Sequence, residues 1–188
     1  MRGFYLKQAQ LMSTQDDFVP PAYMAWVKDT QDNVPSEFSG NEAREFCAKM
    51  LQEELGLKFD EIFSEWDDKP LGVASIGQVH KARLRSTGKE VAVKLQLPGI
   101  ERRFRSDIHT IKSFCWLAMP QHYSAFNEIE RQFCSEFDYY KEGENLEKCR
   151  LAVMPSWSKH VVIPAAYLEY CSKHVLVMEY LDGVKLVD

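Results

Sequence analysis

The stretch that most constrains the fold runs from residue 70 to residue 96, where a loop of small residues leads into two strand-like runs. Four residues of the loop are small enough to let the backbone approach a ligand closely: Gly72, Ala74, Ser75 and Gly77. The turn residues 86–89 separate the two runs and predict a β-hairpin. Since the second run ends on Lys94, its ammonium can lie under the loop and meet phosphate oxygens.

A hairpin that contains glycine is common, and taken alone it favours an ordinary structural hairpin with a solvated lysine. The ending Val91-Ala92-Val93-Lys94 favours the phosphate interpretation, because protein kinases place their phosphate-pairing lysine in this setting. The loop departs from the kinase pattern G-x-G-x-x-G, since residues 72–80 read GVASIGQVH. A standard protein kinase is therefore not expected.

Composition narrows the class of protein further. A chain of 188 residues with 45% hydrophobic side chains suits one domain, or one and a half, with a real core. The net charge of −5 and the lack of a long basic run argue against a nucleic-acid partner. The five cysteines form no CxxC pair and are expected to be reduced. No apolar stretch approaches the ~20 residues that span a bilayer, and residues 1–10 have no feature of a targeting segment.

Hydrophobic spacing predicts the main elements. Four helices are expected before the loop, over residues 3–12, 21–29, 39–55 and 57–66, with Gly56 as a C-terminal cap. After Lys94 we expect a long amphipathic helix over residues 100–118 and a second that begins near Ser124 and runs through residue 145. Short strands are expected at residues 161–163 and 175–178.

The second of these helices carries acids that could hold Lys94. Asp138, Glu142 and Asn145 lie at positions i, i+4 and i+7 and would share one face, with Glu136 roughly 120° around the helix. A helix glutamate that fixes a strand lysine against phosphates is the pairing used by kinases. The alternative is that these acids are solvated on an exposed helix.

Taken together, these motifs resemble the UbiB family of atypical kinases, also called the ABC1-like family, over nearly the whole chain. Its alanine-rich loop is similar to residues 73–80, and its strand lysine matches Lys94. Its E-x-D motif falls on residues 136–138 and its helix glutamate on Glu142. Its K-x-G-Q motif falls on residues 7–10, and residues 178–183 resemble the segment that joins the two kinase lobes.

The resemblance implies an α+β fold, with a helical extension over residues 1–66 and a kinase-like small lobe with an antiparallel sheet over residues 67–188. It also implies ATP or ADP with magnesium as cofactor, and a link to coenzyme Q or other prenyl-lipid metabolism. A lipid or small-molecule substrate, membrane association, and a mitochondrial or plastid location are further expectations that the resemblance carries.

The resemblance also assigns roles to residues. Lys94 would contact the α- and β-phosphates and Glu142 would orient it. The following residues would bind the nucleotide, the last three at the adenine edge: Gly72, Val73, Ala74, Ser75, Ile76, Gly77, Gln78, Val79, Lys94, Glu179, Tyr180 and Leu181. In the regulatory extension, the lysine of K-x-G-Q would be held by the E-x-D glutamate, and the residues concerned are Lys7, Gln10, Glu136 and Asp138.

Two departures qualify these expectations. Ala9 replaces the glycine of the K-x-G-Q motif. The chain ends at Asp188, before the catalytic loop and the metal-binding aspartate of a kinase, so metal ligands are expected in a missing second lobe and none is assigned here. We therefore expect an N-terminal part that is inactive alone. The alternatives are a non-catalytic half-kinase module that binds a protein partner, and a plain α+β domain without a nucleotide site.

Overall fold

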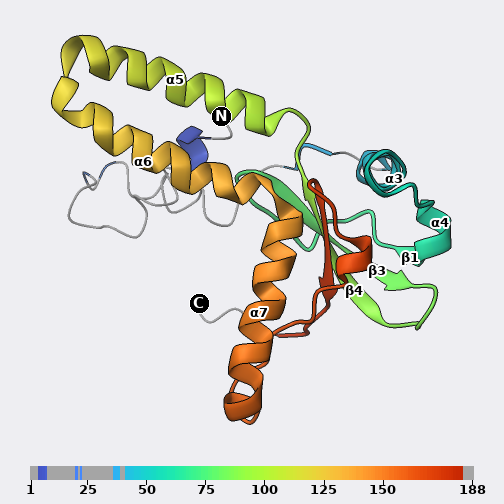
Figure 1. Cartoon of the computed structure of the whole chain (residues 1–188). Coiled ribbons are helices and arrows are strands. Elements are labelled where there is room, and N and C mark those ends of the chain that lie inside the picture. Colours follow the sequence, from blue (N-terminus) through green and yellow to red (C-terminus); the bar gives the residue numbers. More distant parts are fainter. Residues whose placement is uncertain (1–3, 8–19, 21, 23–35, 39–40, 184–188) are drawn as a thin grey trace. The chain divides into compact units, whose positions relative to one another are not determined.

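The computed structural model describes residues 4–7, 20, 22, 36–38 and 41–183 (Figure 1). The chain divides into two compact units. Unit 1 comprises Met1–Glu37, Gly72–Gln78 and Gln96–Phe137. Unit 2 comprises Phe38–Leu71, Val79–Leu95 and Asp138–Asp188. The architecture is α+β with antiparallel strand pairs, which confirms the predicted fold class.

The sheet is centred on the predicted hairpin. Its path runs β1-β3-β4-β5, and a short strand β2 pairs with β3. The bounds are β1 Phe63–Trp66, β2 Gly72–Val73, β3 Gly77–Leu84, β4 Glu90–Gln96 and β5 Val175–Glu179. The turn between β3 and β4 contains Gly88 with φ +69°, a left-handed conformation that favours glycine. The hairpin and the strand near residue 175 are therefore confirmed.

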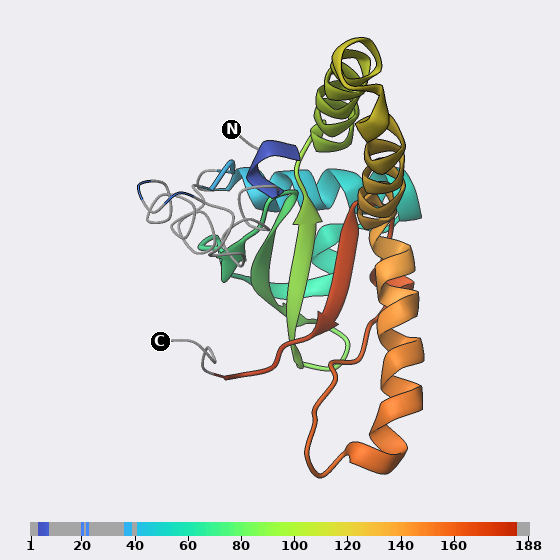
Figure 2. The same cartoon turned by 90° about the vertical axis from the view of Figure 1, so that its left-hand side faces the viewer.

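Unit 2 adds helices to this sheet: α3 Glu42–Leu55, α4 Phe59–Ile62, α7 Tyr139–Trp157 and the short 3₁₀ helix η3 Leu168–Tyr170. Helix α3 ends as predicted, because Gly56 takes φ +70° and its N–H donates to the carbonyl of Gln52. Helix α7 lies beside β5, and both α3 and η3 also contact β5 (Figure 2). The buried apolar side chains of β4 and β5 form the centre of this core.

The helix predicted over residues 57–66 is wrong beyond its first half. Residues 59–62 form α4, and Phe63–Trp66 form strand β1, in which Phe63 lies opposite Leu84 and Trp66 opposite Ala82. Phe59, Phe63 and Trp66 make ring contacts with one another, and Phe59 and Phe63 are buried. Pairing with β3 therefore prevails over the helical spacing of these aromatic residues.

The continuous helix predicted from Ser124 through residue 145 is also wrong. Helix α6 Tyr123–Cys134 is followed by the 3₁₀ helix η2 Ser135–Phe137, and α7 begins at Tyr139. Asp138 has extended φ and ψ of −124° and 92°, and its carboxylate accepts the N–H of Lys141 as an N-cap. The strand expected at residues 161–163 does not form, and Val162 is exposed.

Unit 1 contains α5 Ile100–Ala118, which lies side by side with α6 (Figure 1). The predicted stripe of α5 is buried at Ile100, Phe104, Ile108 and Cys115. The ring of Phe104 contacts the rings of Phe4, Phe133 and Phe137, so the helical residues 4–7 join this core. The rest of the predicted helices over residues 3–12 and 21–29 lies outside the described residues, apart from residue 22.

Candidate functional site

Lys94 of β4 and Glu142 of α7 form an ion pair in unit 2. The Lys94 Nζ lies 2.7 Å from Glu142 Oε1 and 2.9 Å from Oε2. The side chain of Lys94 is 20% exposed and that of Glu142 is 42% exposed. Because the Asp138 cap starts α7 at Tyr139, Glu142 lies in the first helical turn, where an acid interacts favourably with the helix dipole. The structure thus brings together the two residues that the sequence singled out.

Tyr139 is a third member of this cluster, and the sequence reasoning missed it. Its ring centroid lies 4.5 Å from Lys94 Nζ, a distance at which a cation is attracted to the ring face. The residue is fully buried, and its N–H donates to the carbonyl of Lys173. The available signal was its position three residues before Glu142, which places both on one side of a helix that starts at residue 139.

Gly143 lets α7 approach the neighbouring elements closely. A Cβ atom at this position would lie 3.0 Å from Leu168 Cδ2 and 3.2 Å from Leu176 Cδ1. Leu176 is the cross-strand partner of Lys94 in the β4–β5 register. The absent side chain therefore helps to set the distance between α7 and the sheet, and with it the position of Glu142.

Residues 179–181 lie at the end of β5 in the same sheet. Glu179 ends β5 opposite Val91, and its N–H donates to the carbonyl of Ala165. The N–H of Tyr180 donates to the carbonyl of Glu90 at 3.4 Å. Leu181 is exposed. These residues, predicted to meet an adenine base, thus leave the sheet beside the first residue of β4.

The predicted phosphate loop, residues 72–78, belongs to unit 1. Within this loop the N–H of Ala74 donates to the carbonyl of Gly77 at 2.7 Å, so the backbone turns tightly over residues 74–77. The carbonyl of Ile76 accepts the N–H of Leu97 at 2.9 Å. Three loop side chains are buried: Ser75, Ile76 and Gln78. Val79, the next residue predicted to bind the nucleotide, lies on β3 in unit 2.

A second ion pair lies within unit 1. The Lys7 Nζ lies 3.0 Å from Glu136 Oε1 and 2.7 Å from Oε2, and it also sits 5.5 Å from the ring centroid of Phe133. These are the lysine and the glutamate that the extension motif predicts as partners. Gln10 lies outside the described residues, and Asp138 serves as the cap of α7.

Two further properties concern the described part of the chain. Its histidine, cysteine and acidic side chains form no group that could hold a metal ion. Among the helices of the same residues, none has the length and apolarity needed to cross a membrane.

The model of the ABC1 atypical kinase-like domain matches residues 30–188. The chain belongs to the ABC1 atypical kinase-like family. It is 36% identical over 190 residues to an uncharacterized aarF domain-containing protein kinase of Arabidopsis thaliana, which is named as chloroplastic. This match covers 97% of the present chain and 26% of the relative. It is 32% identical over 200 residues to AarF domain-containing protein kinase 1 of Xenopus tropicalis, covering 100% of this chain and 35% of the relative.

A solved structure supports the same relationship. The Rv3197–erythromycin complex from Mycobacterium tuberculosis matches with a TM-score of 0.58 and 28% identity, over 96% of this chain and 44% of that chain. The fold is therefore kinase-like, as the resemblance implied. This chain spans about a quarter to a third of the length of the curated relatives it matches. Kinase-like domains in general use a nucleotide and a metal ion.

Proposed function

We propose that this chain is the N-terminal part of an ATP-dependent atypical kinase or ATPase, and that Lys94 contacts the α- and β-phosphates of the nucleotide. The observation that carries the proposal is the Lys94–Glu142 pair, with contacts of 2.7 and 2.9 Å to the two carboxylate oxygens. Kinase-like enzymes use such a strand lysine and helix glutamate to place an ammonium against phosphates. Membership of a family whose relatives are named kinases supports the same role.

The contacts of Lys94 suit this task. An ammonium has three N–H donors, and the two oxygens of Glu142 accept from Lys94 at hydrogen-bond distance. A third donor suffices for a phosphate oxygen, and a charge-assisted bond of this kind is stronger than a neutral one. The buried ring of Tyr139 limits where the ammonium can move. Lys94 would therefore meet the phosphates already oriented.

The other site residues take roles from their place in the sequence and from the family. The backbone of residues 73–78 would cover the phosphates, and Glu179, Tyr180 and Leu181 would lie along the adenine edge. The nucleotide would be ATP or ADP with magnesium. The catalytic acid and the metal ligands would come from regions of a longer protein, in line with the greater length of the relatives. This chain alone would therefore bind nucleotide weakly and turn over none.

The proposal extends to organisation and biological setting. Residues 1–66 would form the regulatory extension and residues 67–188 the small lobe, with the Lys7–Glu136 pair tying the extension in place. A plastid location fits relatives that are named chloroplastic, and a mitochondrial location is the alternative. Support of coenzyme Q or other prenyl-lipid metabolism, through a lipid or small-molecule substrate, is the setting that the family resemblance implies.

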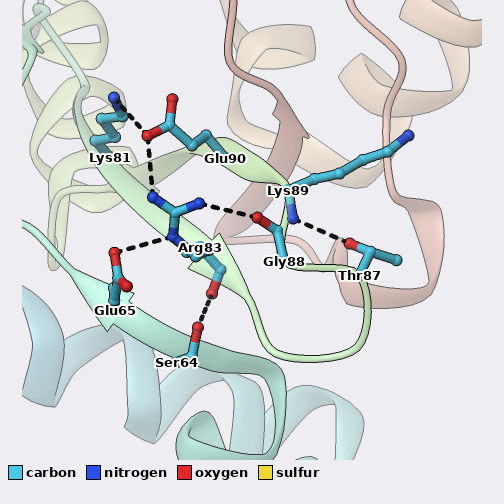
Figure 3. A network of polar contacts seen from close by, with 8 residues as sticks. All are labelled: Ser64, Glu65, Lys81, Arg83, Thr87, Gly88, Lys89 and Glu90. Atoms are coloured by element: carbon cyan, nitrogen blue, oxygen red, sulfur yellow. Dashed lines mark hydrogen bonds and ion pairs between the residues drawn. The ribbon is translucent and has the colours of Figure 1, made fainter.

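Nucleotide titration followed by NMR chemical shifts tests the phosphate role. We expect Lys94→Met to weaken the binding of magnesium-ATP by about ten- to hundredfold, as the loss of a charge-assisted contact implies. Lys89→Met is the matched control, because Lys89 is an exposed lysine of the turn in the same hairpin (Figure 3). Equal affinities of the two variants would refute the role of Lys94.

The second candidate function is a non-catalytic module that binds a protein partner. Unit 2 exposes large apolar side chains at Leu151, Trp157 and Val162, which are 65%, 57% and 63% exposed. Apolar side chains of this size are common in protein interfaces. If the wild-type chain shows no saturable shift with magnesium-ATP, this function replaces the enzyme proposal.

A further inference from the structure

Lys81 of β3 links the hairpin to the segment that follows β5. Its Nζ lies 4.3 Å from the ring centroid of Tyr180 and 3.0 Å from Glu90 Oε1. The backbone N–H of Tyr180 donates to the carbonyl of the same Glu90. Glu90 therefore restrains Tyr180 twice, at the backbone directly and at the ring through Lys81. All three residues belong to unit 2.

This contact lies on the face of the sheet that carries Lys94. Glu90 and Lys94 are four residues apart on β4, and side chains on a strand alternate between faces. The ion pair with Glu90 places Lys81 on that same face. The ion pair holds Lys81 Nζ at the Glu90 end of this face, and four residues of strand place Glu90 about 13 Å along β4 from Lys94. An effect of Lys81 on a bound nucleotide is therefore expected at that end, beside Tyr180, where the base would lie.

The charges around Lys81 keep it a cation. Its hydrogen bond to Glu90 raises the pKa of the Lys81 ammonium, and the charges of Glu90, Tyr180 and Asp182 act in the same direction. Arg83, two residues along β3, contacts Glu90 and Glu65 as well (Figure 3). Lys81 and Arg83 thus share one carboxylate, while the 4.3 Å contact with the Tyr180 ring belongs to Lys81.

We propose that Lys81 is a positioning residue that holds Tyr180, and with it residues 179–181, in the conformation that recognises the base of a nucleotide. This inference rests on the proposed function. Without the cation the ring of Tyr180 loses its partner, and the backbone of residues 179–181 is restrained only by its own hydrogen bonds. Binding of the base then weakens, while binding of the phosphates at Lys94 does not change.

Two ligands separate these effects. Magnesium-ATP carries base and phosphates, whereas magnesium-tripolyphosphate carries only the phosphate chain. We expect the wild-type chain to prefer ATP, and we expect Lys81→Met to reduce that preference by about two- to fivefold through its effect on ATP alone. Lys81→Arg keeps a cation over the ring and should restore the preference. Arg83→Met removes a neighbouring charge that pairs with the same carboxylate and should leave the preference unchanged.

The outcomes distinguish this inference from the function on which it rests. If the wild-type chain binds neither ligand, the proposed function fails and the inference fails with it. If the chain binds both and Lys81→Met keeps the full preference for ATP, only the inference is overturned. An equal loss for ATP and tripolyphosphate also overturns it, because Lys81 would then act as a general positive charge.

Discussion

The Lys94–Glu142 pair should stabilise the chain before any nucleotide binds, and a double-mutant cycle measures by how much. At about 3 Å, Coulomb's law gives roughly 1.4 kcal/mol for two unit charges in water and roughly 5.5 kcal/mol at an effective dielectric constant of about 20. Fixing two long side chains offsets much of this attraction. Since Glu142 is 42% exposed, we take the solvated limit and expect a coupling energy of about 1 kcal/mol.

The cycle uses Lys94→Met, Glu142→Gln and the double variant, with free energies of unfolding from urea denaturation. The control cycle removes the Glu128–Arg131 pair, which has an equally short contact of 2.6 Å but side chains that are 62% and 80% exposed. Its coupling should be indistinguishable from zero, because solvent screens both charges. The two cycles therefore compare two ion pairs of similar contact distance that differ in the exposure of their side chains.

A coupling at Lys94–Glu142 no larger than that of the control would refute the reasoning. It would mean that the contact with the Tyr139 ring and the position of β4 hold Lys94 without help from Glu142. In that case α7 would not orient Lys94, and the contact of this lysine with phosphates would not be preformed.

Three further predictions concern buried groups. Burial lowers the pKa of His80 from its ordinary value of 6.5, so the folded state favours the neutral ring. Stability should therefore decline as the pH falls below 6.5. Urea denaturation at several pH values should show a flatter decline for His80→Gln. Burial raises the pKa of Cys171 from 9.0 to about 11, so stability should fall as the pH rises from 9 to 11, and Cys171→Ala should reduce that loss. Gly143→Ala should destabilise the chain by about 1 kcal/mol in the same assay, because overpacking against Leu168 and Leu176 exceeds the gain of about 1 kcal/mol in helix propensity; a stabilised variant would contradict this.

The sequence predicted elements well where the pattern is local and long. The spacing of apolar residues along residues 100–118 and the turn residues before Lys94 each carry enough information to locate α5 and the hairpin. The prediction for residues 63–66 was wrong, because their aromatic spacing continues that of α4. Their partner strand lies about twenty residues further along the chain. Pairing over that separation leaves no trace in a local pattern.

The same distinction applies to the candidate site. Lys94, Glu142, Lys7 and Glu136 could be selected from motifs, and the structure brings them together as two pairs. Their roles toward a nucleotide stay predictions. Tyr139 and Lys81 could not be selected from motifs. Each is distinguished by a contact between an ammonium and an aromatic ring from different elements, Lys94 with Tyr139 and Lys81 with Tyr180. Asp138 did carry a signal, since aspartate favours N-caps, but it stands within a row of apolar residues that suggested one continuous helix.

The break at Asp138 places the acids of the two ion pairs on separate helical elements. On one unbroken helix, Glu136 and Glu142 would be fixed to a single rigid rod, and any displacement of one would be transmitted to the other. Instead Asp138, with extended φ of −124° and ψ of 92°, separates the 3₁₀ helix that carries Glu136 from the helix that carries Glu142. Each ion pair therefore has a local support of its own, although Glu136 and Glu142 stand only six positions apart in the chain.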